Sequence, residues 1–218
     1  MPPRALHPSG IILVDKPAGP TSFAIVAATR RRTGARTGHA GTLDPFATGL
    51  LLLLSGASTR LQPRFVGLPK RYLTEIDLHA RTSSGDVDGE PVAEHDPPAS
   101  EELDAALDRL RGAVDLPVPA VSAVKIGGER AYALHRRGVV VEMPVRTMHV
   151  HELTLEDYAD GIARLDLLVS SGTYVRAIAD ALGGHCVSLR RTEIGPFHVE
   201  EADPERIIPP DDALARLA

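Results

Sequence analysis

Hydrophobic residues along this chain come in short blocks that are separated by glycine, proline and charged positions. Residues 11–14 (IILV) and 50–54 (five leucines) hold no polar side chain, so each block predicts a buried strand. Residues 71–80 (RYLTEIDLHA) alternate apolar and polar positions with a period of two, which is typical of a half-buried strand. Because glycines bound the leucine block on both sides, we expect residues 50–54 to be a central strand rather than a helix.

Three further segments predict helices. Residues 23–32 (FAIVAATRRR) follow Thr21 and Ser22, either of which is a favourable N-cap, and they stop before Gly34. Residues 101–112 (EELDAALDRLRG) follow Ser100 as the expected N-cap and place two glutamates in the first turn, where the helix dipole favours negative charge. Residues 170–184 (SSGTYVRAIADALGG) predict a third, capped helix, and the polar residues 82–100 predict a loop.

The second half of the chain predicts strands around an excursion. Residues 117–144 contain prolines, a glycine pair and a short helix that ends at Gly138, so we expect them to leave the sheet as an insertion. Strands are predicted at 139–143 (VVVEM), 146–158 and 163–170. We expect the folded domain to span residues 1–199, and residues 200–218 to form an acidic tail with no room for another domain.

Composition restricts the class of protein. With 218 residues and 43% hydrophobic content, the chain is long enough to build one domain with a real core. Neither apolar block approaches the roughly 20 residues that cross a bilayer, and we expect neither a membrane span nor an export signal. Cys186 is the only cysteine, which excludes an intrachain disulfide and favours a reducing compartment, the cytoplasm.

Charge is distributed unevenly. The formal net charge is -5, yet residues 1–80 carry ten Lys or Arg against four Asp or Glu. A polyanion would therefore meet a basic N-terminal part of the chain. Charge alone leaves open the alternative that these side chains are a solvated helix end, where cations oppose the negative dipole. The basic residues in question are Arg30, Arg31, Arg32, Arg36, Arg60, Arg64, Lys70 and Arg71.

Several chemistries are excluded by spacing. The phosphate-binding pattern G-x-x-x-x-G-K-[ST] does not occur. Residues 83–89 (SSGDVDG) resemble the start of a calcium loop, but Ser84 occupies its first position and His95 the place of the bidentate glutamate, so we reject calcium there. His149 and His151 lie two apart in a strand-like segment without a zinc-binding spacing, so we expect no metal site.

The stretch GHAGTLDPFATG, residues 38–49, holds one acid in a glycine-rich bend. Asp44 precedes Pro45, which disfavours the helical conformation and leaves the carboxylate projecting from a stiff turn. Glycines at 38, 41 and 49 leave space for a bulky ligand beside the backbone. Taken alone, an Asp-Pro pair is more often a turn whose acid accepts a backbone hydrogen bond.

The whole set of motifs resembles the TruB family of tRNA pseudouridine synthases. Besides GHAGTLDPFATG, the resemblance rests on VDKPAGPTS near the start, KRY at 70–72, SAVKIGGERAY at 122–132, SSGTYVRA at 170–177 and LRRTEIGPF at 189–197, in family order. It implies an α+β fold with a mixed, largely antiparallel sheet flanked by helices and an RNA-gripping loop at 117–144. Most bacterial relatives continue into a small RNA-binding PUA domain, which we do not expect in this chain.

The resemblance also implies an activity and a set of residues. It implies that uridine in the T-arm loop of tRNA (position 55) is isomerised to pseudouridine after the base is flipped out, without a cofactor. We expect a monomer that holds no metal. It assigns Asp44 as the catalytic aspartate, Tyr72 as the aromatic residue beside the base and Arg176 as the guanidinium paired with the acid. The residues implied to bind substrate or RNA are His39, Gly41, Thr42, Lys125, Tyr174, Leu189 and Arg191.

Three of these residues also have a purely structural explanation. Tyr72 could be ordinary strand packing, Arg176 a solvated helix residue, and His39 the cap of a turn. For the whole protein the alternative is an RNA-binding or RNA-folding module that keeps the fold and lacks turnover. The presence of Asp44, Tyr72 and Arg176 together favours the enzyme, because a protein that only binds RNA does not need an acid facing a phosphate-rich ligand.

Overall fold

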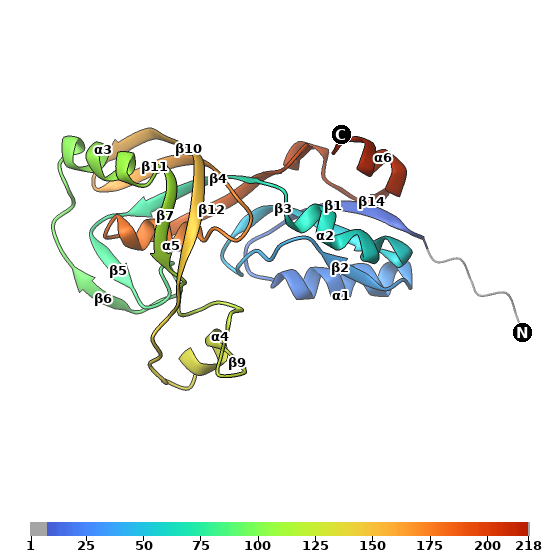
Figure 1. Ribbon diagram of the computed structural model, residues 1–218, viewed down its shortest axis with the longest axis horizontal. Helices are drawn as coiled ribbons and strands as arrows, with labels where there is room; N and C mark the ends of the chain where they lie inside the picture. The colour runs from blue at the N-terminus through green and yellow to red at the C-terminus, as the bar shows by residue number, and fades with distance from the viewer. Residues whose placement is uncertain (1–7, 218) are drawn as a thin grey trace, which may run out of the picture. The chain divides into compact units, whose positions relative to one another are not determined.

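The computed structural model describes residues 8–217, which form two compact units. Of the described residues, unit 1 combines 8–72 with 190–217, and unit 2 is Leu73–Leu189. A ten-stranded, mixed and mostly antiparallel sheet is the main element of the fold (Figure 1). Two of its strands, β4 (Lys70–Asp77) and β12 (His185–Ile194), begin in one unit and end in the other. The predicted α+β class with helices flanking a mixed sheet is therefore confirmed.

In unit 1 the strand order is β14, β1, β3, β12. The central pair is antiparallel, with β1 (Gly10–Lys16) and β3 (Thr48–Ser55) in a register that places Leu13 opposite Leu52. Strand β12 pairs with β3 in parallel, with Arg191 opposite Gly49. Short strands β2 (Thr37–His39) and β13 (Phe197–His198) pair with β3 and β12. The predicted strands at 11–14 and 50–54 are confirmed.

The leucine block is continuous because β3 is covered on both faces. Leu50, Leu52 and Leu54 pack in one cluster with Phe65 and Ala213, whereas Leu51 and Leu53 pack in another with Val26. Figure 1 shows the two covering helices, α1 (Ser22–Thr33) and α6 (Pro210–Ala215), on opposite sides of β1 and β3. A strand buried on both faces has no position for a polar side chain, which explains why the alternation of a half-buried strand is missing here.

Helix α1 has the predicted ends. Thr21 is the N-cap, and its side chain accepts a hydrogen bond from Ala24 N at 3.1 Å. Gly34 ends the helix in the left-handed conformation (φ 65°), and its N–H donates to Arg30 O. Both termini thus satisfy backbone groups that the helix itself leaves without partners. The other helical segments of unit 1 are η1 (Gly56–Leu61), α2 (Gln62–Val66) and η2 (Val199–Glu201).

The predicted acidic tail is an ordered part of unit 1. Residues Asp203–Ile208 form β14, the edge strand beside β1, and Ala213 in α6 is fully buried. The acidic residues of this segment lie on its exposed side, for example Asp211 and Asp212 in the first turn of α6. The sequence average hides the few apolar positions that hold the segment against the core.

In unit 2 the strand order continues from β12 through β4, β11 (Ile162–Val169) and β10 (Val145–Ala159) to β7 (Gly112–Pro117). The predicted strands at 71–80, 146–158 and 163–170 are confirmed, and β4 shows the expected alternation of burial. Helix α3 (Ser100–Arg109) buries Leu103 and Leu107. Helix α5 is shorter than predicted and spans Val175–Ala181.

Two local predictions in unit 2 are wrong. The N-cap of α3 is Ala99 and not Ser100, and the side chain of Glu102 accepts a hydrogen bond from Ala99 N (3.1 Å). The polar segment 82–100 is also not all loop, because β6 (Pro91–Glu94) pairs with β5 (Ala80–Thr82) in a separate hairpin. Every residue of β6 is exposed, so no hydrophobic pattern marks this strand in the sequence.

The excursion at 117–144 leaves the sheet between β7 and β10 and carries the small elements β8 (Lys125–Ile126), β9 (Glu129–Arg130) and α4 (Ala131–His135) (Figure 1). Its ends meet where Val118 N donates to Pro144 O at 3.0 Å. The strand predicted at 139–143 is wrong. Val140 is 97% exposed and the segment has no strand partner, so its high β-propensity has no ladder to join.

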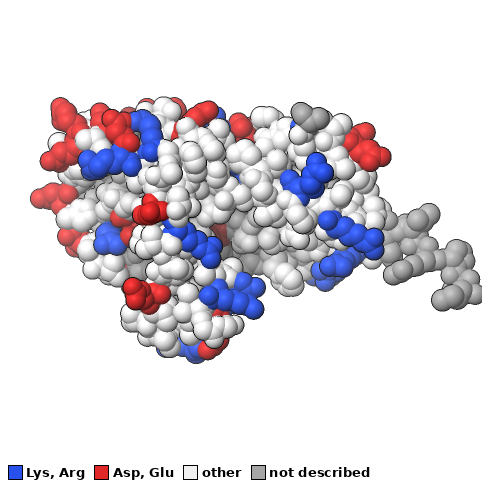
Figure 2. Space-filling model, viewed as in Figure 1, with Lys and Arg blue, Asp and Glu red and all other residues white. Residues whose placement is uncertain are grey.

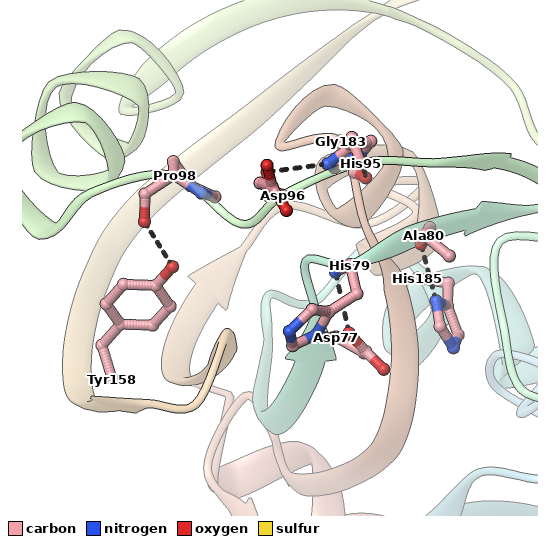
Figure 3. Close-up of polar contacts among 9 residues, drawn as sticks. All are labelled: Asp77, His79, Ala80, His95, Asp96, Pro98, Tyr158, Gly183 and His185. Carbon is pink, nitrogen blue, oxygen red and sulfur yellow. Dashed lines mark hydrogen bonds and ion pairs between the residues drawn. The ribbon is translucent and has the colours of Figure 1, made fainter.

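Histidines of unit 2 fix turns of the backbone, as Figure 3 shows. His79 Nδ1 lies 2.8 Å from the carboxylate of Asp77, His95 Nε2 lies 2.8 Å from Gly183 O, and His185 Nδ1 lies 2.8 Å from Ala80 O. In the same region Tyr158 donates to Pro98 O at 2.6 Å. Within residues 8–217 no group of three or more potential ligands could hold a metal ion.

None of the helices in the described chain combines the length and apolar character needed to cross a membrane.

Candidate active site

The loop between β2 and β3, residues 40–47, carries Asp44 as a half-buried residue. Its start is fixed by Ala40, whose N–H donates to Leu52 O at 2.9 Å. Glycines at both ends adopt conformations that other residues rarely reach, with φ 126° at Gly41 and φ 102° at Gly49. The glycine-rich sequence therefore supplies the two backbone conformations that flank Asp44.

Ser22 holds the loop immediately before the acid. Its hydroxyl donates to Leu43 O and accepts from Leu43 N, both at 2.8 Å, and the side chain is 2% exposed. Ser22 is also the first residue of α1, so the helix and the loop are joined through one side chain. This double hydrogen bond fixes the backbone one residue from Asp44 and leaves no buried polar group of Leu43 without a partner.

Lys16 holds the loop immediately after the acid. Its buried ammonium donates to the carbonyl oxygens of Pro17 (2.8 Å), Pro20 (2.9 Å) and Pro45 (3.2 Å). Burial lowers the pKa of Lys16, and the negative charge of Asp44 opposes that change by raising it. The carboxylate of Asp44 is thus close enough to the Lys16 ammonium to affect its pKa, and three carbonyl oxygens fix the position of that ammonium.

Arg191 lies under the loop and is 1% exposed. Its Nε donates to Leu50 O at 2.7 Å, its Nη2 to Gly41 O at 3.1 Å and its Nη1 to Thr42 O at 3.4 Å. The same Nη1 lies 3.5 Å from the hydroxyl of Tyr72. A guanidinium buried in this way offers no surface to a phosphate, so the structure gives Arg191 a different environment from the RNA contact expected of it.

Tyr72 is 8% exposed and comes from β4. The guanidinium carbon of Arg191 lies 6.0 Å from the centre of its ring. In unit 1, then, one arginine contacts both the loop that carries Asp44 and the hydroxyl of Tyr72. Arg191 thus supports both Tyr72 and the loop of Asp44, although the two residues are 28 positions apart in the sequence.

The positive charge of Arg191 helps to lower the pKa of two other basic side chains, Lys70 and His39. Lys70 is 5% exposed and donates to Val66 O (2.6 Å) and to Leu68 O, and its pKa is lowered to about 8, first by burial and second by Arg191. The pKa of His39 is lowered by the same two causes in the same order. Gly41 N donates to His39 Nδ1 at 3.3 Å, so this ring nitrogen is the unprotonated one, while the main chain of His39 accepts from Gln62 (2.7 Å).

Arg176 lies in unit 2 and is 3% exposed. It donates to Ser84 O (2.6 Å) and Val121 O (2.8 Å), and its Nε lies 3.5 Å from the carboxylate of Asp86. Asp86 in turn accepts from the hydroxyl of Ser84 and from Asp88 N (3.2 Å). The alternative of a solvated surface arginine is therefore wrong, since the guanidinium is buried and oriented by a buried acid.

A cavity of about 140 Å³ lies beside Arg176 within unit 2. Its walls come from the loop at 82–85, the first residues of the excursion at 117–120, Met143, and α5. Among the other predicted residues of unit 2, Lys125 is exposed in the excursion, Tyr174 is half-buried at the N-cap of α5, and Leu189 is 7% exposed at the end of the unit. The predicted pairing of Asp44 with Arg176 joins residues of different units and stays a prediction.

Four residues of these clusters were not singled out for the site from the sequence: Lys16, Ser22, Lys70 and Asp86. Lys16 is the last residue of β1 and Lys70 is the first residue of β4. A lysine at the end of a strand usually reaches solvent, and only the fold shows that these two are buried. Ser22 was weighed only as a helix cap. Asp86 lies in a glycine-containing turn, where an aspartate commonly bonds to nearby backbone, and this pattern does not predict its contact with Arg176.

The charge pattern of the surface follows the sequence only in part. On the face in view in Figure 2, acidic side chains gather over α3, whose exposed positions include Glu101, Asp104 and Asp108. The excursion carries both signs, and Arg137 forms an ion pair with Glu129 at 2.8 Å. In unit 1 the first turn of α1 has no acid and its last turn holds Arg30, Arg31 and Arg32.

Comparison with known proteins identifies the family. The model of the TruB family pseudouridylate synthase (N terminal domain) matches residues 29–175. The chain belongs to the TruB family. Among TruB relatives, tRNA pseudouridine synthase B of Xanthomonas campestris pv. campestris (strain 8004) is 44% identical over 207 residues, which cover 91% of this chain and 67% of the relative. The Synechococcus sp. (strain CC9311) protein of that name is 42% identical over 236 residues, covering 96% and 79%.

A solved structure supports the same TruB fold. The crystal structure of a Cbf5-Nop10-Gar1 complex contains a chain that matches with a TM-score of 0.67 and 26% identity over 87% of this chain. This chain spans half the length of that protein, since the match covers 50% of it. The family resemblance seen in the motifs is confirmed.

Proposed function

We propose that this chain isomerises uridine to pseudouridine in tRNA, at the T-arm uridine of position 55, with Asp44 as the catalytic carboxylate. Membership of the TruB family and the name tRNA pseudouridine synthase B of its relatives support the reaction and the substrate class. The observation that carries the site is the support of Asp44, which is held by Ser22 at Leu43 and by Lys16 at Pro45. A carboxylate fixed on both sides in a half-buried loop is prepared for one defined geometry.

The reaction rearranges bonds without changing composition. The N1–C1′ glycosidic bond breaks, the base turns, C5 bonds to C1′, C5 loses its proton and N1 gains one. No electrons are exchanged with a cofactor and no energy source is consumed, so the chain's own side chains suffice for the balance. The carboxylate of Asp44 acts either by attack on C1′ or by taking up a proton as the base leaves.

Arg176 is proposed to pair with the carboxylate of Asp44. A fixed guanidinium beside a carboxylate stabilises negative charge there during the reaction. Asp86 and the carbonyl oxygens of Ser84 and Val121 fix the guanidinium of Arg176, which supports its use as a preorganised partner. Asp86 is thus a positioning residue that acts through Arg176.

Tyr72 is proposed to stack on the uracil and to place its hydroxyl near C5. The hydroxyl is the acceptor for Arg191, which leaves its own proton available to a partner in the substrate or to water. Leu189 and Tyr174 complete the apolar side of the base site in this proposal. Both are withdrawn from solvent in the structure, Leu189 fully and Tyr174 in part.

RNA binding is proposed to extract the target base from the stack of the T-loop. Extrusion of a base costs a few kcal/mol, which phosphate contacts offset. His39, Gly41 and Thr42 lie at the start of the Asp44 loop, where a flipped nucleotide would enter, and Lys125 in the excursion is exposed for a phosphate. Recognition then depends on the shape of the stem-loop more than on base edges.

Tritium release tests this function. A T-arm transcript labelled with 5-³H-uridine loses its label only when C5 forms the new bond, so wild-type protein should release tritium in proportion to pseudouridine formed. The control is the same transcript with cytidine at the target position and labelled uridine elsewhere. Release from the first RNA and not from the second supports the proposal. Absence of release from both at saturating protein, with RNA binding intact, favours the non-catalytic alternative.

A further inference from the structure

Arg191 is the largest fully buried side chain of the described residues, and its position is unusual for a cation. A buried guanidinium needs a partner for each donor, because desolvation of a charge is costly. Its recorded acceptors are three carbonyl oxygens and one phenol oxygen, at Leu50, Gly41, Thr42 and Tyr72. All of them are neutral, so the charge of Arg191 stays uncompensated by them and acts on the groups around it.

These acceptors surround the loop that carries Asp44. Gly41 and Thr42 lie before the acid and Leu50 lies after it. The backbone of Arg191 adds a contact at the far end, since Arg191 is opposite Gly49 in the parallel pairing of β12 with β3. One residue therefore contacts the chain on both sides of Asp44, with its side chain at Gly41, Thr42 and Leu50 and its main chain at Gly49.

The fourth acceptor links the loop to strand β4. Arg191 Nη1 is shared between Thr42 O (3.4 Å) and the hydroxyl of Tyr72 (3.5 Å). Any shift of the guanidinium therefore moves the start of the Asp44 loop and the phenol together. Lysine could not replace it, because a single ammonium cannot direct planar donors at four acceptors.

We propose that Arg191 is a positioning residue for the isomerisation, which sets the Asp44 loop and the Tyr72 hydroxyl in a fixed mutual geometry and does not contact RNA. This inference rests on the proposed function. A residue with this task contributes to the chemical step and not to RNA affinity, because its donors face the protein interior. The exposed neighbour Arg190, which pairs with Asp15 at 2.8 Å, is a matched control from the same strand.

The test is single-turnover pseudouridine formation at saturating T-arm RNA, with the dissociation constant of the RNA measured in parallel. Arg191→Lys is expected to slow the rate by at least about 30-fold and to change RNA affinity by less than about 3-fold. Arg190→Lys is expected to change both by less than about 3-fold. Tyr72→Phe removes the shared hydroxyl, so Arg191→Lys should cost less in that background than in wild type.

Each other outcome overturns the proposal. A loss of RNA affinity that equals the loss of rate assigns Arg191 to RNA binding. A wild-type rate in Arg191→Lys, or equal losses with and without the Tyr72 hydroxyl, removes the link between loop and phenol. If Arg191→Lys does not fold, Arg191→Ala with added guanidinium ion takes its place, and rescue of the rate by the ion is expected; failure of both variants to fold leaves only a structural role. Absence of activity in wild type instead contradicts the proposed function, and the two failures are thereby distinguished.

Discussion

Gly49 and Arg191 lie so close that a β-carbon on Gly49 would stand 2.2 Å from the carbonyl oxygen of Arg191. Real side chains essentially never reach this separation from a backbone oxygen. Gly49 also has φ 102°, which L-residues with a side chain rarely adopt. The glycine at the end of the GHAGTLDPFATG motif is thus required by the parallel pairing of β12 with β3 as well as by the turn itself.

Gly49→Ala should therefore destabilise unit 1 severely. The variant adds a backbone clash to an unfavourable φ, and we expect a loss of more than about 3 kcal/mol in the free energy of unfolding. Gly38→Ala is the control within the same motif, because nothing lies within 4 Å of its β-carbon position, and it should cost less than about 1 kcal/mol. Denaturant unfolding of both variants measures the difference. Equal losses would show that the close approach of Arg191 is absent in solution.

Ser22→Ala should loosen the Asp44 loop from the other side. It leaves the N–H and the carbonyl of Leu43 without partners in a buried place, at a cost of about 1–3 kcal/mol. The rate of pseudouridine formation should fall roughly 10- to 100-fold, since small displacements of a catalytic group are costly. Ser58→Ala is the matched control, because Ser58 Oγ is buried without a hydrogen-bond partner in the described chain. A Ser22→Ala variant that behaves like Ser58→Ala would remove Ser22 from the support of Asp44.

Lys70 should make stability depend on pH in the alkaline range. Its pKa is lowered from 10.5 to about 8 in the folded protein, so between these values the unfolded chain binds more protons and stability rises with pH. The contribution to the slope is at most about 1.4 kcal/mol per pH unit. The penalty of the buried charge is full below pH 8 and disappears above 10.5. Unfolding of wild type and Lys70→Met, compared between pH 7 and 10, isolates this effect; an identical slope in both proteins would contradict it.

Arg176 should be needed for turnover. Arg176→Ala removes the guanidinium that is proposed to pair with Asp44, so the rate of pseudouridine formation should fall at least about 30-fold. Arg176→Lys keeps the charge and should lose less of the rate. The measurement is single-turnover pseudouridine formation at saturating T-arm RNA. A wild-type rate in Arg176→Ala would show that Arg176 does not act on the reaction.

Local patterns sufficed where one segment determines its own structure. The five leucines predicted β3, because a strand covered by α1 on one face and α6 on the other has only apolar positions. Thr21 and Gly34 predicted the ends of α1, since capping depends on the residues at the ends themselves. The motifs identified the family because they occur in order along the chain.

Prediction failed where a distant segment decides. Val139 and Val140 have strand propensity but no neighbouring strand, so the predicted strand does not form. The family resemblance implies that Arg191 binds substrate or RNA, and no pattern in the sequence indicates that its side chain is buried. Its burial follows from the pairing of β12 with β3, which no single-sequence pattern shows. The burial of Lys16 and Lys70 also depends on segments that are distant in the sequence, and it was not predicted.

The most direct test of the account is tritium release by Asp44→Asn. Asparagine keeps the shape of the side chain and removes its charge, so the loop held by Ser22, Lys16 and Arg191 should remain in place. We expect wild type to release tritium from the labelled T-arm transcript and Asp44→Asn to release it at least about 1000-fold more slowly, with RNA affinity changed by less than about 3-fold. Equal release by the two proteins would contradict the assignment of Asp44 as the catalytic residue.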